Sequence, residues 1–129
     1  MKRLSGVLGA AVLALALSTC DGGPTAGELA FDLTTPNTND GAVQFVATAT
    51  LPDSIIGVTA ACTGCQVFLA RVSASNVRGV ITGDIGAGAL LRLNVTEVGK
   101  PELYAVTVVA AASRTFAIQS GAYSLAVEK

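Results

Sequence analysis

The sequence has no histidine and no tryptophan, and it contains only two tyrosines and three cysteines among 129 residues. Without an imidazole, a Ser-His-Asp triad and every other histidine-dependent acid–base site are excluded. A structural zinc site needs four nitrogen or sulfur ligands, whereas this chain offers a single closely spaced cysteine pair. We therefore expect no catalytic residue, no metal site and no cofactor, so the protein is expected not to be an enzyme.

Charge is also scarce, with eight basic and nine acidic residues and a formal net charge of −1. The basic residues are scattered along the chain, so the basic patch typical of a nucleic-acid-binding protein is missing. The glycine-rich "GDIGAGAL" is not followed by the Lys-Ser/Thr of a phosphate-binding loop and is expected to form turns. We expect no nucleic-acid partner.

Four aspartates have the chemistry for general acid–base catalysis or for calcium binding, namely Asp32, Asp40, Asp53 and Asp84. Asp40 and Asp84 stand in the loop-like segments "NTNDG" and "TGDIG". Isolated aspartates in such segments usually hydrogen-bond to their own backbone. We expect both to form turns rather than a site.

The N-terminal segment has the layout of a secretory signal, with Lys2 and Arg3 followed by an apolar run over residues 4–19. The run is shorter than the roughly 20 residues of a membrane-spanning helix. Its end, "LSTC" at residues 17–20, resembles the lipobox of bacterial lipoproteins, although Thr19 stands where that motif usually has Gly, Ala or Ser. The resemblance implies cleavage before Cys20 and lipidation of this cysteine. The alternative is cleavage after Ala16 and secretion without a lipid.

This resemblance implies a membrane-anchored lipoprotein of the bacterial cell envelope, with the choice between inner and outer membrane left open. The expected organisation is a signal peptide over residues 1–19, a flexible tether over 20–27 and one domain over 28–129. The tether, "CDGGPTAG", would span roughly 15 Å as a random coil. The domain is therefore expected to lie close to the membrane.

The other two cysteines, Cys62 and Cys65, are separated by two residues in "AACTGCQ". A tight turn brings two such Cα atoms within the range of about 4.4–6.8 Å that a disulfide bridges, and an oxidising compartment favours the bond. A redox-active pair would normally stand at a helix N-terminus, whereas both flanks here resemble strands. We expect a structural disulfide, with free or redox-active thiols and a metal site as alternatives.

From residue 28 onward, apolar and polar residues alternate in short segments separated by turn signals, as in "ELAFDLT" and "ALLRLNV". This pattern predicts an all-β fold, an antiparallel β-sandwich of about seven or eight strands. We place Phe68 and Phe116 in the core because they stand in strand patterns. The predicted core also contains Phe31, Phe45, Leu91, Leu93, Val106 and Leu125.

A glycine-rich turn leads into an alternating strand in "TGDIGAGALLRLNV", after the strand-like "NVRGVITG". This order resembles the Ig-like sandwiches of cohesin and carbohydrate-binding modules, and it implies a binding or assembly module. Only Tyr104 and Tyr123 remain for stacking on a sugar, so a protein partner, reached through sheet edges or the threonine-rich face of "FVATATL", is favoured over a polysaccharide. The expected function is a lipid-anchored, non-enzymatic envelope module for binding or adhesion. The alternative is an envelope thiol-disulfide protein that uses Cys62 and Cys65.

Overall fold

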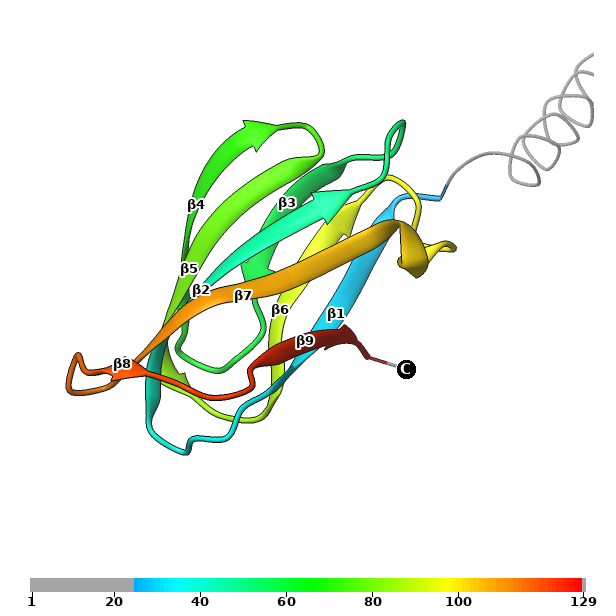
Figure 1. The fold of residues 1–129 in the computed structure, drawn as a ribbon. Coiled ribbons are helices and arrows are strands. Elements are labelled where there is room, and N and C mark those ends of the chain that lie inside the picture. Colours follow the sequence, from blue (N-terminus) through cyan, green and yellow to red (C-terminus); the bar gives the residue numbers. More distant parts are fainter. Residues whose placement is uncertain (1–24, 129) are drawn as a thin grey trace, which may run out of the picture.

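The computed structural model describes residues 25–128, which form two antiparallel sheets packed face to face (Figure 1). One sheet has four strands in the order β3-β6-β1-β9, and the other has five in the order β4-β5-β2-β7-β8. The predicted fold class is thus confirmed. The strands are β1 Gly27–Thr34, β2 Asp40–Ala49, β3 Ile55–Ala60, β4 Gln66–Ser73, β5 Asn76–Ile85, β6 Gly88–Val95, β7 Tyr104–Ser113, β8 Ile118–Gln119 and β9 Ser124–Val127, and a 3-10 turn, η1, covers Pro101–Leu103.

The alternation in the sequence explains which side of each strand is buried. In β1, Leu29, Phe31 and Leu33 are buried and the residues between them are partly exposed. The structure has nine strands among residues 25–128 rather than seven or eight. The difference arises at the C-terminal end, where the two-residue β8 is too short to give any periodic signal.

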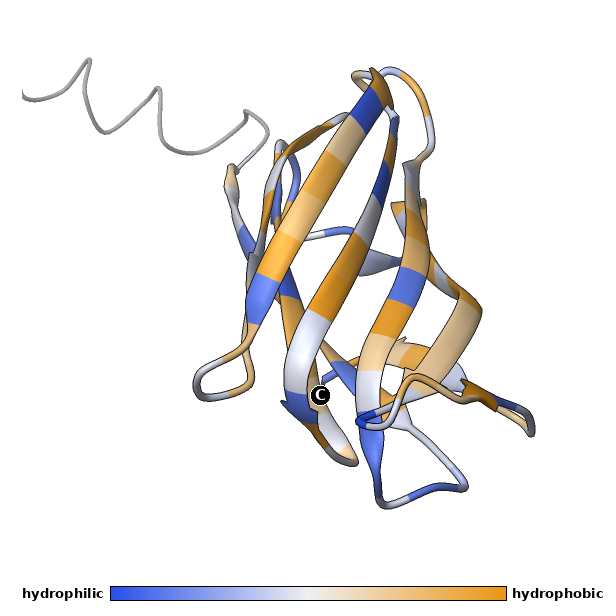
Figure 2. Ribbon diagram, turned by 90° about the vertical axis from the view of Figure 1, so that its left-hand side faces the viewer, coloured by the Kyte–Doolittle hydropathy of each residue, from blue (hydrophilic) through white to orange (hydrophobic). Residues whose placement is uncertain are grey.

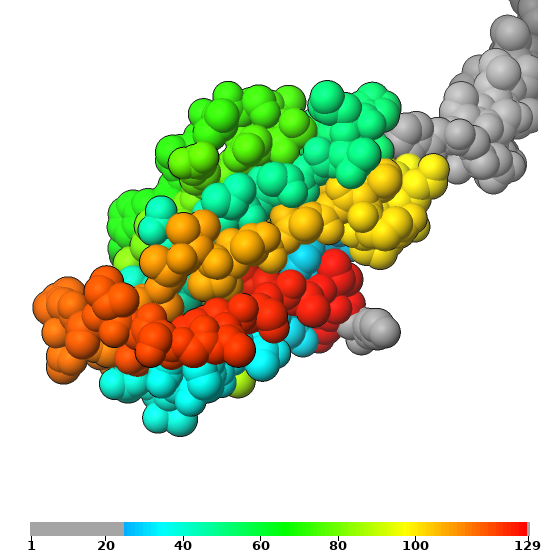
Figure 3. All heavy atoms as spheres, in the orientation of Figure 1, coloured from blue at the N-terminus to red at the C-terminus, as the bar shows by residue number. Residues whose placement is uncertain are grey.

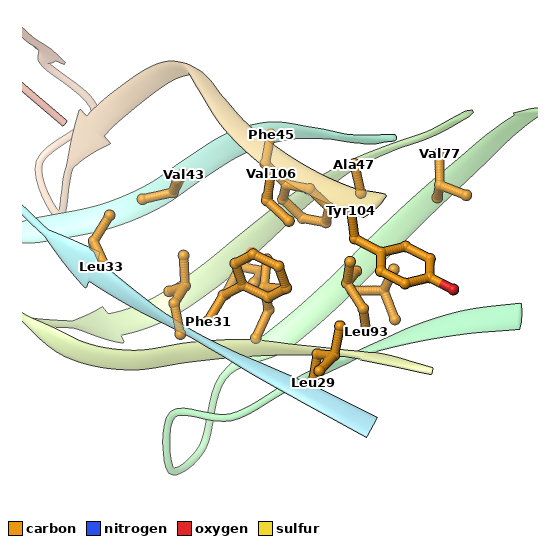
Figure 4. Packing of buried hydrophobic residues seen from close by; sticks show 14 of the residues in the cluster. Leu29, Phe31, Leu33, Val43, Phe45, Ala47, Val77, Leu93, Tyr104 and Val106 are labelled. Carbon is orange, nitrogen blue, oxygen red and sulfur yellow. The ribbon is translucent and has the colours of Figure 1, made fainter. Parts of the chain in front are cut away.

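The core lies between the sheets, where the rings of Phe31 and Phe45 face each other across the interface (Figure 4). Five of the predicted core residues are buried, namely Phe31, Phe45, Leu91, Leu93 and Val106. A sixth, Leu125, is half-buried at the margin of the core. Two phenylalanines predicted to be in the core, Phe68 and Phe116, are instead exposed. Both side chains are therefore available to contact a partner.

Gly79 of β5 is a position where neighbouring side chains leave no room for a Cβ atom. It pairs with Phe45 across the β2–β5 ladder, and a Cβ at this position would lie 2.5 Å from Cζ of Phe45. No side chain fits in that space, so glycine lets the buried ring lie directly over the backbone of β5.

Strand β1 begins at one end of the sandwich, and the β7–β8 hairpin lies at the other (Figure 1). The carbonyl of Thr25 accepts a hydrogen bond of 2.7 Å from the Val98 amide, which fixes the start of the domain beside the β6–β7 connection. The predicted signal peptide, Cys20 and most of the tether lie outside the described residues. No helix within residues 25–128 is long and apolar enough to cross a membrane.

Candidate interaction surface

The two cysteines of "CTGC" form a disulfide in the turn between β3 and β4. Their Cα atoms are 5.5 Å apart, and the Cys65 amide donates a hydrogen bond of 3.2 Å to the carbonyl of Cys62. Both residues are half-buried and pack against the core. Cys65 lies so close to Gly83 of β5 that a Cβ there would be 3.0 Å from its Sγ. The bond therefore closes the turn between β3 and β4, and the packing of Cys65 places this turn against β5.

Asp40, at the start of β2, is fully buried. Its sequence context predicted a turn-forming aspartate bonded to its own backbone, and this prediction was wrong. Its Oδ2 accepts a hydrogen bond of 2.6 Å from the Thr35 hydroxyl, and its Oδ1 accepts one of 2.6 Å from Tyr123. The Tyr123 hydroxyl in turn accepts a hydrogen bond of 2.7 Å from the Asn37 side-chain amide. These contacts join the β1–β2 loop to the C-terminal segment, and they occupy both carboxylate oxygens of Asp40.

The other aspartates have partners different from those of Asp40. Asp84 is exposed and pairs with Arg114 rather than with its own backbone, which corrects the turn prediction for this residue as well. The Thr96 hydroxyl donates a hydrogen bond of 3.3 Å to Asp53, and Asp32 is half-buried on β1. Among the described residues, no three His, Cys, Asp or Glu side chains gather as metal ligands would.

Neither tyrosine offers a flat exposed ring. Tyr104 is buried in the core, where its hydroxyl accepts a hydrogen bond of 3.0 Å from the Glu97 amide. Tyr123 is half-buried and engaged with Asp40. The aromatic side chains that do reach solvent are the two phenylalanines that the sequence had assigned to the core.

Phe68 is 57% exposed and Phe116 is 91% exposed. Phe116 lies at the tip of the β7–β8 hairpin with a left-handed backbone, at a φ of 67°. Phe68 lies on β4, whose alternation is the same as that of an interior strand. Periodicity shows which residues share a face of a strand, but not whether anything packs on that face. The sequence reasoning therefore missed that β4 is an outer strand.

Strand β4 carries the largest concentration of exposed apolar side chains on the sandwich. Phe68, Leu69 and Val72 are 57%, 46% and 62% exposed, and they lie within five residues of one edge strand. Figure 2 looks onto this side of the molecule, and hydrophobic colour runs almost unbroken along β4 between two hydrophilic bands. We call Gln66–Ser73, with its free backbone edge, the β4 edge.

The outer face of the five-stranded sheet continues from the β4 edge as a shallow surface of small residues. One hollow of about 350 Å³ lies beside Phe68 and Ala70, over Gln44 and Val80. A second, of about 200 Å³, is lined by Ala42, Ala110, Ala112 and Ile118 among others. Thr48, the one threonine of β2, belongs to the same alternating set as Gln44. This face thus combines small apolar residues with longer polar side chains, including Gln44 and Arg78.

A third depression, of about 570 Å³, lies at the opposite flank between β7, β9 and η1. Figure 3 shows the C-terminal segment lying along β7 on this side. Phe31, Tyr104 and Leu125 line the depression together with Glu102 and Glu128. It is larger than either hollow on the five-stranded sheet.

Comparisons of the chain with models of known families, with curated proteins and with solved structures gave no match. The lipobox-like signal and the likeness to cohesin domains therefore remain predictions from the sequence. The structure itself establishes a two-sheet antiparallel sandwich with an internal disulfide. Any function has to be argued from the surfaces described above.

Proposed function

We propose that this protein is a non-enzymatic binding module of the bacterial cell envelope, anchored by a lipid on Cys20 and bound to other protein through its five-stranded sheet. The observation that carries the proposal is the β4 edge. Large apolar side chains are costly to leave in water when they lie together. An edge strand of eight residues also presents backbone groups that an extended partner strand can pair with.

The positively charged start, the short apolar run and "LSTC" before a tether support the anchor. The anchor and the binding surface would not compete for the same place. The chain enters through β1, which lies in the four-stranded sheet, whereas the β4 edge belongs to the other sheet. A domain held at β1 keeps its five-stranded sheet available to a partner.

A thiol-disulfide function is the less well supported alternative. It would require Cys62 and Cys65 to exchange with a substrate disulfide, yet both are half-buried and Cys65 is packed against Gly83. The pair spans a turn between two strands, so it lacks the helix N-terminus that lowers the pKa of catalytic thiols in many redox proteins. A structural role for the disulfide accords better with these contacts.

The anchor is tested by replacing Cys20 with Ser in the full chain and fractionating the cells. We expect the wild-type protein in the membrane fraction, with an acyl-modified cysteine as its first residue by mass spectrometry. The Cys20→Ser variant should leave that fraction or keep its signal uncleaved. An unmodified mature N-terminus at Leu17 would instead establish ordinary secretion.

The binding surface is tested by placing a photo-crosslinking amino acid at Phe68 in the anchored protein. A matched probe at Asn94, which is exposed on β6 in the other sheet, serves as the control. We expect crosslinked products of defined mass at position 68 and none of them at position 94. Equal crosslinking at both positions would mean that the five-stranded sheet is not the binding surface.

A further inference from the structure

The backbone of β4 is hydrogen-bonded on one side only. Residues 66–73 pair with β5, and the sheet ends there (Figure 1). Outside this ladder, no backbone–backbone hydrogen bond within residues 25–128 reaches Gln66–Ser73. About half of the amides and carbonyls of an edge strand point away from its sheet. The β4 edge is therefore a ready template for one more strand.

Natural edge strands are usually protected by proline, by lysine, by a bulge or by a covering loop. Strand β4 contains neither proline nor lysine. Its bulge lies between Arg71 and Ser73, at the hairpin end, so Gln66–Arg71 remains regular. Its single charge is on the exposed Arg71, whose guanidinium donates hydrogen bonds of 3.0 Å to the Ile56 carbonyl and 3.2 Å to the Ser73 carbonyl.

We propose that the partner of the β4 edge is a second copy of this chain, paired antiparallel through β4 about a two-fold axis that passes midway between the two Ala70 residues. Within the regular segment Gln66–Arg71, this arrangement sets Leu69 opposite Arg71 of the second copy, and it brings Phe68 near the bulge at Val72 of the second copy. The three exposed apolar side chains then gain neighbours on both faces of the joined sheet. The partner supplies the same unpaired edge that the first copy presents.

The register follows from charge and side-chain size. An axis through Arg71 would place two guanidinium groups opposite each other, and like charges directly opposed are destabilising. An axis through Ala70 brings together two small side chains at the centre and puts each Arg71 beside the aliphatic Leu69.

A single pair of eight-residue strands forms a small interface, near the lower limit of about 1,000 Å² for a specific association. The pairing is therefore weak in dilute solution and depends on a high local concentration. Anchoring both copies in one membrane supplies that concentration, so this part of the argument rests on the proposed function. The experiment below is carried out on membranes for the same reason.

The register is tested by a cysteine at the two-fold axis. Directly opposed Cα atoms in an antiparallel pair are about 4.5–5.5 Å apart, which is within the range for a disulfide. The full-length Ala70→Cys protein in isolated membranes, treated with a mild oxidant, should run as a disulfide-linked dimer on a non-reducing gel. Ala105→Cys, an exposed alanine on β7 of the same sheet, is the matched control and should stay monomeric, as should the wild-type chain.

Charge substitutions at Leu69, made in the Ala70→Cys background, distinguish this pairing from a general apolar contact. Leu69→Lys should abolish the dimer because it opposes Arg71 of the second copy, whereas Leu69→Glu should preserve or increase it. Self-pairing would be overturned if Ala70→Cys gave no more disulfide-linked dimer than Ala105→Cys. It would also be overturned if Leu69→Lys and Leu69→Glu reduced the dimer equally, or if Ala70→Cys formed a mixed disulfide with another protein. Fractionation of Cys20→Ser reports on the anchor separately, so the two proposals can fail independently.

Discussion

Replacing Tyr123 with Phe should destabilise the domain more than the partial burial of the Tyr123 side chain suggests. The substitution removes the hydroxyl that donates to the fully buried Asp40 at 2.6 Å and that accepts from Asn37 at 2.7 Å. A hydrogen bond to a charged group contributes about 1.5–3 kcal/mol, and a buried acceptor that loses its donor costs a similar amount. We expect the free energy of unfolding to fall by about 2–3 kcal/mol.

The assay is urea or thermal unfolding followed by circular dichroism, with Tyr104→Phe as the control. The Tyr104 hydroxyl only accepts a hydrogen bond from the neutral Glu97 amide, so its removal should cost about 0.5–1.5 kcal/mol. At about 4–8 °C per kcal/mol for a domain of this size, the two variants should be separated by several degrees. Tyr123→Phe should be the less stable.

A smaller effect at Tyr123 than at Tyr104 would refute the view that Asp40 depends on the C-terminal segment. Asp40→Asn provides a second check, because its effect should not add to that of Tyr123→Phe if the two groups interact directly. Additive losses would mean that each residue acts independently of the other.

Three further predictions concern positions elsewhere in the domain. Gly79→Ala should lower the free energy of unfolding by about 1–3 kcal/mol by overpacking, since the new Cβ meets Phe45 at 2.5 Å. Denaturant unfolding should show a smaller loss when the same substitution is made in a Phe45→Ala background. Replacing Cys62 and Cys65 together with Ser should lower stability only modestly, because a disulfide that closes so short a loop constrains the unfolded chain little; rapid reduction of a test disulfide by the wild-type protein would contradict this structural role. Phe116→Gly should raise the melting temperature slightly because glycine adopts a φ of 67° without strain, and a lower melting temperature would show that the exposed ring stabilises the fold.

The fold class was predictable because alternation is a local signal. Val43, Phe45 and Ala47 stand two residues apart in the sequence and all lie on the buried side of β2. The order of the strands was not predictable in this way, since β1 pairs with β6 residues more than 50 positions away. Which strand ends a sheet depends on such distant pairings. The exposure of Phe68 results from the position of β4 at the end of its sheet, and no local sequence pattern shows that position.

Some features of β4 nevertheless differ from those of a strand with one buried face. In "QVFLARV", apolar residues occupy both alternating sets, with Val67 and Leu69 on one side and Phe68 and Ala70 on the other. Such a composition is typical of a central strand, and it equally suits an outer strand that a partner covers. For Asp40, the limitation was distance along the chain, because its donor Tyr123 is 83 residues away.

The position of β1 dictates how an anchored pair would be oriented. A two-fold axis perpendicular to the joined sheet sends the two β1 starts to opposite ends of the pair, and a ten-residue strand such as β2 alone spans about 33 Å. Residues 20–27 reach at most about 26–29 Å when fully extended. Two upright domains therefore could not both reach one bilayer, so the pair has to lie on its side. The four-stranded sheet, which contains β1, would then rest against the lipid head groups, and the five-stranded sheet would form a continuous platform of about ten strands that faces away from them.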